Sequence, residues 1–401
     1  MNTERLKHNP ARAAEILCAG GLVAVPTETV YGLAGNGLDS DAVQRIYDVK
    51  GRPTVKPLAL MVHDASWMPR LCTDVPRAAK ALAERFWPGP LTIILPAKGL
   101  IPEIVRAGGD TIGLRCPDHP DTLSVIETSG LPLAAPSANP SGRPSPKSAS
   151  EVADYFEGTI DAIIDGGPCG IGTESTIVDL AHTPYRILRQ GALPAEEVWN
   201  CVRDCVQVIG ITGGTGTGKT TLLHVLEQHD AFIVDADAVY HELLETDQTL
   251  LSAIENRFPG VVEDGVLQRK RLGAQVFGDA KSLADLNAIT HGAIRAEIER
   301  RLLAFAKNGG TLAAIDAVAL VESGIAASCS TVIGVTAPRE ARIERLLARE
   351  GVTREYAQAR IDAQQSDAWY RENCDVVIDN NSDIETFQIQ AEKIIQEVLS
   401  R

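Results

Sequence analysis

The run VIGITGGTGTGKTT at residues 208–221 constrains the fold of this chain more than any other stretch. It matches the pattern G-x-x-x-x-G-K-[ST] at every position, from Gly213 to Thr220. An apolar segment precedes the motif, and a helical pattern, KTTLLHVLEQH, follows it. A strand, a glycine-rich loop and a helix in this order place backbone N–H groups and a helix dipole around a phosphate. We therefore expect a nucleotide-phosphate site that begins in the middle of a 401-residue chain.

The motif also assigns individual roles at this site. The Lys219 ammonium is expected to reach the β- and γ-phosphates of ATP, and the Thr220 hydroxyl to hold Mg²⁺. The remaining contacts are expected from backbone amides and small side chains along the loop. The predicted ATP-binding set of this half is Gly213, Gly214, Thr215, Gly216, Thr217, Gly218, Lys219, Thr220 and Thr221.

The length of the chain and the pattern along it predict two α/β domains, residues 1–203 and 204–401. The second half alternates long helical segments with the apolar runs VQVIGIT, AFIVDAD, TLAAIDAVAL, TVIGVTA and DVVIDN. Short apolar strands between helices predict a parallel five-stranded sheet with helices on both faces. The first half has glycine- and proline-rich turns between short strands, which favours a mixed, twisted sheet. Its Pro/Ser-dense run at 135–150 is interpreted as a loop inside that domain.

Composition excludes several classes of protein. A net charge of −15 and only 4% aromatic residues argue against a sequence-independent nucleic-acid binder, which needs a basic surface. No stretch approaches the ~18 apolar residues of a membrane span. The first residues, MNTERLKHNPARAAEI, lack the apolar core of a secretory signal, and the eight cysteines show no metal-site spacing. We expect a cytoplasmic protein with reduced thiols.

Two carboxylates follow the second apolar run of the second half, at Asp235 and Asp237. The N-K-x-D motif of a GTPase is absent from the sequence, and the length suits a small-molecule kinase whose acceptor needs a base. Ligands bind at the carboxyl ends of strands in such sheets, where these residues are expected. The structural alternative is that an aspartate here caps the following helix.

The second half resembles the dephospho-CoA kinase family over residues 206–401. The resemblance rests on TGGTGTGKTT, VDADAVYHEL, DGVLQRKRLGAQVF, LNAITHGAIRAEI, REARIERLLAREGVTREYAQARIDAQ and DVVIDNN, in this order. It implies that ATP phosphorylates the 3′-hydroxyl of the dephospho-CoA ribose. It also implies that Asp237 is the base and that Arg345 and Arg349 belong to a lid over the phosphates. We expect these two arginines to act with Lys219 and Asp237 in catalysis.

One segment departs from that family. Where its members have a Pro-Leu-Leu-Phe-Glu-like run, this chain reads IDAVALVESG, which retains acidic residues at Asp316 and Glu322 but lacks the proline and the aromatic residue. The segment lines the acceptor side in the family. A kinase for another small acceptor, such as a nucleoside or a sugar, therefore remains an alternative.

The first half has no P-loop but offers scattered cations and neutral donors. Its distinctive runs are VPTETVYGLAGNG, YDVKGRPTVKPLAL, FWPGPLTIIL, DTIGLRCP, APSANPSGRPSP and GTESTIVDL. Taken alone, these residue types are explained equally well by a binding site for a phosphate and a zwitterion or by ordinary turns. Over residues 8–200 the runs resemble the YrdC-like L-threonylcarbamoyladenylate synthase family. That family joins L-threonine, bicarbonate and ATP into threonylcarbamoyl-AMP and pyrophosphate, which serves tRNA threonylcarbamoyladenosine modification.

The resemblance assigns two sets of residues in this half. The threonine set is Thr27, Arg115, Ala135 and Ser175. The ATP set is Lys50, Arg52, Thr54, Thr111, Ser137, Asn139, Ser145 and Arg189. Arg115 suits a carboxylate and Lys50 suits phosphate charge that builds up during adenylation. Many relatives carry a further C-terminal domain, where this chain has the kinase-like half, so any lid function of that domain is either missing here or supplied by the Pro-rich loop.

The leading hypothesis is a bifunctional enzyme with two ATP sites, small-molecule substrates and possible tRNA-modification proteins as partners. The alternative from another class is a non-catalytic RNA-binding module attached to a kinase, against which the acidic charge and scarce aromatics argue. Oligomeric state and communication between the halves stay open.

Overall fold

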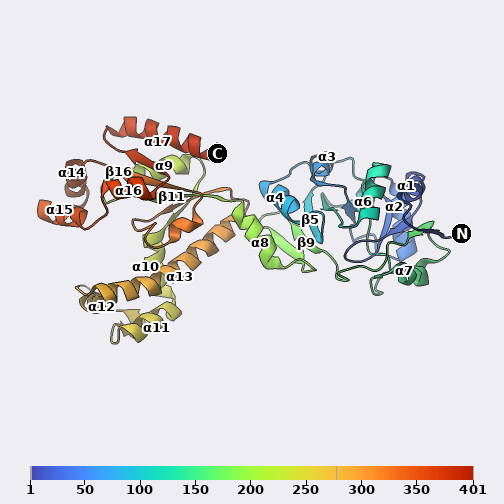
Figure 1. Cartoon of the computed structure of the whole chain (residues 1–401), viewed down its shortest axis with the longest axis horizontal. Coiled ribbons are helices and arrows are strands. Elements are labelled where there is room, and N and C mark those ends of the chain that lie inside the picture. The colour runs from blue at the N-terminus through green and yellow to red at the C-terminus, as the bar shows by residue number, and fades with distance from the viewer. Residues whose placement is uncertain (1, 277, 401) are drawn as a thin grey trace. The chain divides into compact units, whose positions relative to one another are not determined.

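The computed structural model describes residues 2–276 and 278–400. The chain divides into two compact units. Unit 1 comprises Met1–Cys205 with Lys307–Gly309, and unit 2 comprises Val206–Ala306 with Gly310–Arg401. Figure 1 shows the elements of each unit, and each unit is described by itself below.

Unit 1 is built on a ten-stranded mixed sheet with the order β1-β8-β2-β3-β7-β4-β6-β5-β9-β10. Neighbouring strands pair in parallel at β4–β6 and β5–β9, and antiparallel at β2–β3 and β5–β6. The mixed sheet expected for this half is therefore confirmed. The strands are β1 (Glu4–Leu6), β2 (Val23–Val25), β3 (Gly32–Asn36), β4 (Ala59–Met61), β5 (Leu91–Pro96), β6 (Thr111–Arg115), β7 (Leu133–Ala134), β8 (Ala162–Ile164), β9 (Thr176–Asp179) and β10 (Arg186–Arg189).

Short helices cover this sheet. They are α1 (Pro10–Cys18), α2 (Ser40–Lys50), α3 (Met68–Leu71), α4 (Arg77–Phe86), α5 (Glu103–Arg106), α6 (Pro120–Ser129), α7 (Ala149–Phe156) and α8 (Ala195–Asp204), with a 3₁₀ turn at Ala65–Trp67. Local sequence sets the ends of α2: the Asp39 side chain caps its first turn, and Gly51 ends it at φ 56°. The Pro/Ser-dense run forms the loop from β7 to α7, inside unit 1 as expected.

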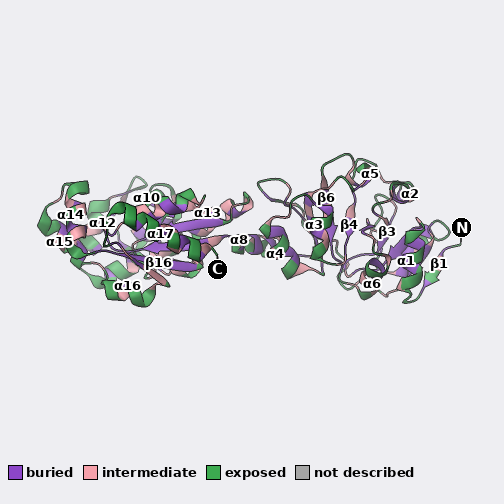
Figure 2. Cartoon of the chain, turned by 90° about the horizontal axis from the view of Figure 1, so that it is seen from above, coloured by how far each residue is buried: buried purple, intermediate pink, exposed green. Residues whose placement is uncertain are grey.

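Unit 2 contains a five-stranded sheet in the order β12-β15-β11-β16-β17, and every pair of neighbours is parallel. The strands are β11 (Gln207–Thr212), β12 (Phe232–Asp235), β15 (Leu312–Asp316), β16 (Thr331–Thr336) and β17 (Val376–Asp379). All six residues of β16 are buried, and Figure 2 shows this strand in the buried colour. Burial on both faces explains why the sequence shows apolar runs instead of alternation. The parallel sheet expected for this half is confirmed.

The third apolar run is shorter as a strand than its sequence suggests. The apolar run TLAAIDAVAL extends to Leu320, whereas β15 ends at Asp316 and turns follow to Gly324. The register explains this end, because Asp316 pairs with Asp235, the last residue of β12, and with Ile211 of β11. Past that point β12 has ended, and β11 continues only to Thr212. Asp316 therefore stands at the carboxyl edge of the sheet.

Helices pack on both faces of the unit 2 sheet, and α17 and α9 lie side by side in Figure 1. Away from the sheet, apolar side chains of the four helices α10, α11, α12 and α13 and of the β13–β14 hairpin pack into a cluster of their own. The elements are α9 (Lys219–Gln228), α10 (Ala236–Thr246), α11 (Gln248–Arg257), α12 (Arg269–Val276), α13 (Ala280–Lys307), α14 (Arg339–Glu350), α15 (Arg354–Asp362), α16 (Asp367–Asn373), α17 (Ile384–Leu399), the strands β13 (Val262–Glu263) and β14 (Val266–Leu267), and a 3₁₀ turn at Ile325–Ser328. Among the described helices, none combines the length and apolar composition that a membrane crossing requires.

Candidate nucleotide-binding sites

The glycine-rich loop of unit 2 joins the end of β11 to the start of α9. Gly213, Gly216 and Gly218 adopt φ of 146°, 78° and 106°, which side chains disfavour. Space is as restrictive as conformation: a Cβ on Gly213 would lie 2.4 Å from the Val335 carbonyl oxygen. The sequence pattern thus reflects a tight turn of the backbone, and the loop residues line a cavity.

The Lys219 ammonium lies at the centre of this loop. It donates to the Gly213 carbonyl at 2.9 Å and lines a cavity of about 450 Å³. Burial lowers its pKa, while the nearby carboxylates of Asp316 and Asp237 act in the opposite direction. A buried cation beside backbone amides suits a polyphosphate.

Asp316 is a site residue to which sequence reasoning gave no role. Its Oδ1 is buried and has no hydrogen-bond partner among the residues that the structure describes. Burial raises the pKa of this carboxyl to about 6; Lys219 opposes the shift, whereas Asp235 and Asp237 add to it. The sequence did offer one indication of a role for Asp316, because it is an acidic residue inside an apolar run of the half that contains the P-loop. A buried carboxylate oxygen without a partner is a ready ligand for a hard cation.

The two aspartates after β12 have different surroundings. Asp235 ends the strand, and its Oδ1 accepts from the backbone N–H groups of Asp237 at 2.8 Å and Ala238 at 3.0 Å. The helix-capping alternative therefore describes Asp235. Asp237 lies in the first turn of α10, one step beyond the strand end where the sequence placed it, and lines the neighbouring pocket.

Arginines of α14 and α15 border the cavity, but they are not equivalent. Arg345 donates from Nη1 to the Gly216 carbonyl at 3.0 Å, so it braces the loop directly. Arg349 lines the same cavity and pairs with Glu350, its neighbour in sequence. Arg360 is a third lining cation that the sequence did not single out.

Arg342 and Gln364 form a clamp on the loop that sequence reasoning missed. Arg342 is buried, and its Nε donates to the Thr215 carbonyl at 2.9 Å. Its Nη2 donates to Gln364 Oε1 at 2.7 Å, and the Thr215 N–H donates to the same oxygen at 2.8 Å. The arginine-rich segment was the only signal, and it does not say which arginine points inward.

A second pocket adjoins the loop and has a mixed lining. Its polar groups come from α10 and α13, and its wall includes the segment after β15 that departs from the family pattern. The lining residues are Ala236, Asp237, Tyr240, Leu283, Leu286, Asn287, Thr290, His291, Ile294, Ala317, Ala319, Ser323 and Ile325. Asp237 lines this pocket, and its charge also acts on Lys219 of the phosphate cavity.

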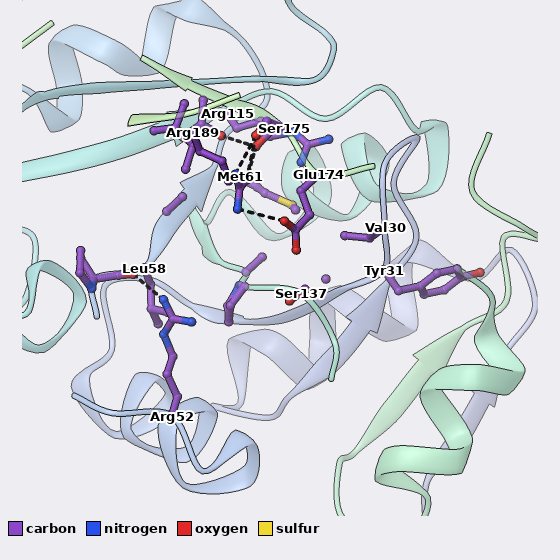
Figure 3. Close-up of a pocket in the computed structure, with 17 residues that line it drawn as sticks. Val30, Tyr31, Arg52, Leu58, Met61, Arg115, Ser137, Glu174, Ser175 and Arg189 are labelled. Atoms are coloured by element: carbon purple, nitrogen blue, oxygen red, sulfur yellow. Dashed lines mark hydrogen bonds and ion pairs between the residues drawn. The ribbon is translucent and has the colours of Figure 1, made fainter. Parts of the chain in front are cut away.

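Unit 1 holds a separate pocket of about 260 Å³, shown in Figure 3. Of the predicted residues, it brings together Arg52, Arg115, Ala135, Ser137, Ser175 and Arg189. Thr27, Lys50, Asn139 and Ser145 lie close behind or beside this lining, as the contacts below show. Thr111 opens β6, and Thr54 is exposed on the loop after α2; neither is among the lining residues.

Lys50 lies behind the pocket wall. It is the last residue of α2, so the left-handed Gly51 turns the chain and sends Arg52 to the lining. The Lys50 ammonium donates to the carbonyls of Ser137 and Asn139 and fixes the Pro-rich loop. Burial, together with the nearby Arg52 charge, lowers the Lys50 pKa to about 8.

Asn139 extends this anchor within the loop. Its Nδ2 donates to the carbonyls of Pro140 at 3.0 Å and Arg143 at 2.5 Å. Its buried Oδ1 has no partner within residues 2–276 and 278–400. An acceptor of this kind is left for an N–H or hydroxyl donor of a ligand.

Arg115 is held from behind by a carboxylate. Its Nη2 donates to Glu28 Oε1 at 2.6 Å and to Thr29 Oγ1 at 2.7 Å, and both side chains of the ion pair are largely buried. Thr27 Oγ1 accepts from the N–H groups of Thr29 and Val30 at 3.2 Å, and so shapes the same turn. The guanidinium is thereby oriented before any ligand arrives.

Arg189 and Ser175 lie beside Arg115 in this pocket, as Figure 3 shows. Nε and Nη2 of Arg189 donate to the Ser175 carbonyl at 3.0 and 2.8 Å, and Ser175 Oγ lies 2.9 Å from Thr92 Oγ1. Glu174, which sequence reasoning did not single out, accepts from Ser145 Oγ at 3.0 Å and pairs with Arg189 at 3.4 Å. Figure 3 shows the dashed contacts around Glu174 and Arg189.

Comparison with known proteins places each unit. The family model described as "Telomere recombination" (Sua5, YciO and YrdC proteins) matches residues 15–191, and the model described as "Dephospho-CoA kinase" matches residues 207–386. A threonylcarbamoyl-AMP synthase of Pseudomonas syringae pv. syringae is 36% identical over 45% of this chain and 96% of its own length. A dephospho-CoA kinase of Corynebacterium efficiens is 36% identical over 48% of this chain and 98% of its own length. The chain belongs to both families.

A threonylcarbamoyl-AMP synthase of Pyrococcus abyssi is 50% identical over 46% of this chain and 55% of its own length. The chain thus spans about half the length of the first curated relatives that it matches. The family memberships expected from the sequence are confirmed for both halves. Both families use ATP, so the two pockets are compared with a nucleoside triphosphate below.

Proposed function

We propose that the chain is a bifunctional enzyme with one ATP-dependent reaction in each unit. Unit 2 transfers the γ-phosphoryl group of ATP to the 3′-hydroxyl of dephospho-CoA. Unit 1 forms L-threonylcarbamoyl-AMP and pyrophosphate from L-threonine, bicarbonate and ATP. The proposal rests on family membership of each unit together with the donor sets of the two pockets.

For unit 2, the observation that carries the proposal is the phosphate cavity together with a second pocket lined by Asp237, whose charge acts on Lys219. The loop amides and Lys219 hold the β- and γ-phosphates, and Arg345 and Arg349 neutralise charge on the transferred group. Asp237 faces the acceptor side and takes the proton of the attacking hydroxyl.

The residues present fit Mg²⁺. Thr220 and Asp316 line one cavity, and they offer a hydroxyl and a carboxylate oxygen that lacks a partner among the described residues. Mg²⁺ prefers such hard oxygen ligands and takes the rest from phosphates and water. Thr220 and Asp316 would hold the ion, which supplies charge neutralisation between the β- and γ-phosphates when it is bound.

The acceptor pocket supports a ligand with both apolar and polar parts. Ala317 and Ala319 stand in its wall where the family has larger side chains, while Tyr240 and His291 come from α10 and α13. Small side chains leave room, so the departure noted in the sequence changes the shape of the pocket and leaves the phosphate cavity intact. An acceptor screen with dephospho-CoA, nucleosides and sugars tests this point; a nucleoside or sugar preferred over dephospho-CoA would overturn it.

For unit 1, the carrying observation is the pre-oriented Arg115 beside the Arg189–Ser175 pair in one pocket. Arg115 binds the threonine carboxylate, and Thr27, Ala135 and Ser175 complete that end of the site. Lys50, Arg52, Thr54, Thr111, Ser137, Asn139, Ser145 and Arg189 serve the ATP end. The carbamate oxygen attacks the α-phosphate, so the protein needs no nucleophilic side chain.

Two assays on the purified full chain test the proposal. The first measures ADP formed on addition of dephospho-CoA, and the second measures pyrophosphate released on addition of L-threonine and bicarbonate. Both products are expected. Absence of the second product together with salt-sensitive tRNA binding would replace the unit 1 assignment by an RNA-binding module. The same preparation serves to look for tRNA-modification proteins as partners.

A further inference from the structure

We propose that Glu174 is a ligand for the divalent cation that accompanies ATP in unit 1, which would give the chain a second nucleotide-linked metal site besides that at Thr220. The inference rests on the proposed function of unit 1. Glu174 is the single acidic side chain among the described residues that line the pocket, whose charged lining otherwise consists of Arg52, Arg115 and Arg189.

The position of Glu174 is fixed by the fold. Its carbonyl accepts from the Ala192 N–H at 2.9 Å, and a Cβ on Gly191 would lie 2.2 Å from that carbonyl oxygen. The chain after β10 therefore packs directly on the backbone of Glu174. The carbonyl of the next residue, Ser175, accepts two hydrogen bonds from the Arg189 guanidinium. Because its backbone is held in this way, Glu174 presents its carboxylate to the pocket from a fixed position.

The side chain of Glu174 is held less firmly than its backbone. Glu174 accepts one hydroxyl bond from Ser145 at 3.0 Å, and its pair with Arg189 is long at 3.4 Å. The Glu174 side chain remains 42% exposed and the Arg189 side chain 40% exposed. Both partners are therefore accessible to a ligand, and Figure 3 shows Glu174 extending into the pocket between Arg189 and Ser137.

A bare carboxylate at this place opposes the binding of a polyphosphate. Its negative charge offsets Arg189 and acts on Lys50, two of the cations expected to serve ATP. A divalent cation between the carboxylate and the phosphates turns this repulsion into attraction and frees Arg189 for a phosphate oxygen. The Ser145 hydroxyl beside Glu174 adds a second hard oxygen donor. One or two protein oxygens completed by phosphates and water are typical of Mg²⁺ sites.

Two other roles for Glu174 make different predictions. As a brace for Arg189 and Ser145, it would act without any metal. As an acceptor for ribose hydroxyls, it would strengthen nucleotide binding equally with and without a cation. Neither role changes the number of metal ions bound per chain.

The test counts Mn²⁺ ions by electron paramagnetic resonance on the full chain with saturating α,β-methylene-ATP. Wild type is expected to bind two nucleotides and two nucleotide-dependent Mn²⁺ ions per chain. Glu174→Gln is expected to retain two nucleotides but only one tightly bound Mn²⁺, and Glu174→Asp to retain the second ion with at least tenfold weaker affinity. Glu127→Gln, on the exposed face of α6 and outside the pocket, is the matched control for lost charge.

Two Mn²⁺ ions in Glu174→Gln, with affinities as in Glu127→Gln, would overturn the metal role in favour of the brace or ribose roles. If wild type binds only one nucleotide per chain, the proposed function of unit 1 fails, and this inference fails with it. Dephospho-CoA-dependent ADP formation in each variant reports whether unit 2 is intact. If Glu174→Gln fails to fold by thermal unfolding, the Mn²⁺ affinity of Glu174→Asp decides the question: an unchanged affinity overturns the inference.

Discussion

Gly218 is the most informative single position in the phosphate loop, because both its backbone and its surroundings exclude a side chain. Its φ is 106°, and a Cβ would lie 2.3 Å from Asn380 Nδ2. That nitrogen donates to the Thr217 carbonyl at 2.8 Å, and Asn380 is buried. In Gly218→Ala the asparagine must therefore rotate away and give up this bond.

The two costs are separable. A left-handed backbone costs an alanine about 1–2 kcal/mol, and a buried polar group left without its bond costs about 1–3 kcal/mol. Restoring the binding shape of the loop therefore costs about 2–5 kcal/mol in total, which corresponds to a loss of ATP affinity of about 30- to 4,000-fold. We expect the KM for ATP in the dephospho-CoA-dependent reaction to rise in this range.

Gly260→Ala is the matched control in the same unit. Gly260 has φ of 81°, but a Cβ there meets no atom within 4 Å. It should cost about 1 kcal/mol of stability and leave the KM for ATP unchanged. The threonine-dependent reaction of unit 1 should be the same in both variants. A KM within threefold of wild type in Gly218→Ala would refute the argument that this loop is pre-shaped by Asn380.

Four further variants test the electrostatics of the two sites. Burial raises the pKa of Asp316 to about 6, so its carboxylate forms only above that pH. We therefore expect kcat/KM of the kinase reaction to fall as the pH drops through 6. The Asp316→Asn variant should lack this inflection. The ammonium of Lys50, with a pKa lowered to about 8, loses its charge above that pH; threonine-dependent pyrophosphate release should decline there, and Lys50→Arg should shift the decline upward. Arg345→Ala should raise the KM for ATP more than Arg349→Ala, because only Arg345 also bonds the loop carbonyls; equal effects would argue against that brace.

The features that could be predicted from the sequence are those that depend on residues adjacent in the chain. The P-loop is one run of eight residues, and its chemistry follows from spacing alone. The parallel sheet follows from apolar runs between helices, which report burial on both faces. The ends of strands are harder to predict: β15 stops at Asp316, level with the last residue of β12 and one residue before the end of β11, and that information lies about 80 and 100 residues away in the sequence.

The residues that the sequence missed act through contacts between distant segments. Burial raises the pKa of Asp316, and Arg342 contacts Thr215 across 127 positions of the chain. Glu174 was passed over inside a family run because only the folded pocket brings it to Arg189 and Ser145. For the same reason Lys50, predicted at the phosphates, proves to hold two carbonyls of the Pro-rich loop.

The central claim is that two separate ATP sites serve two reactions in one chain. Measuring both products in the single variants Lys219→Ala and Lys50→Ala tests it most directly. Lys219→Ala should abolish dephospho-CoA-dependent ADP formation and leave threonine-dependent pyrophosphate release intact, and Lys50→Ala should do the reverse. Loss of both products in either folded variant, or of neither product in both, would contradict the account.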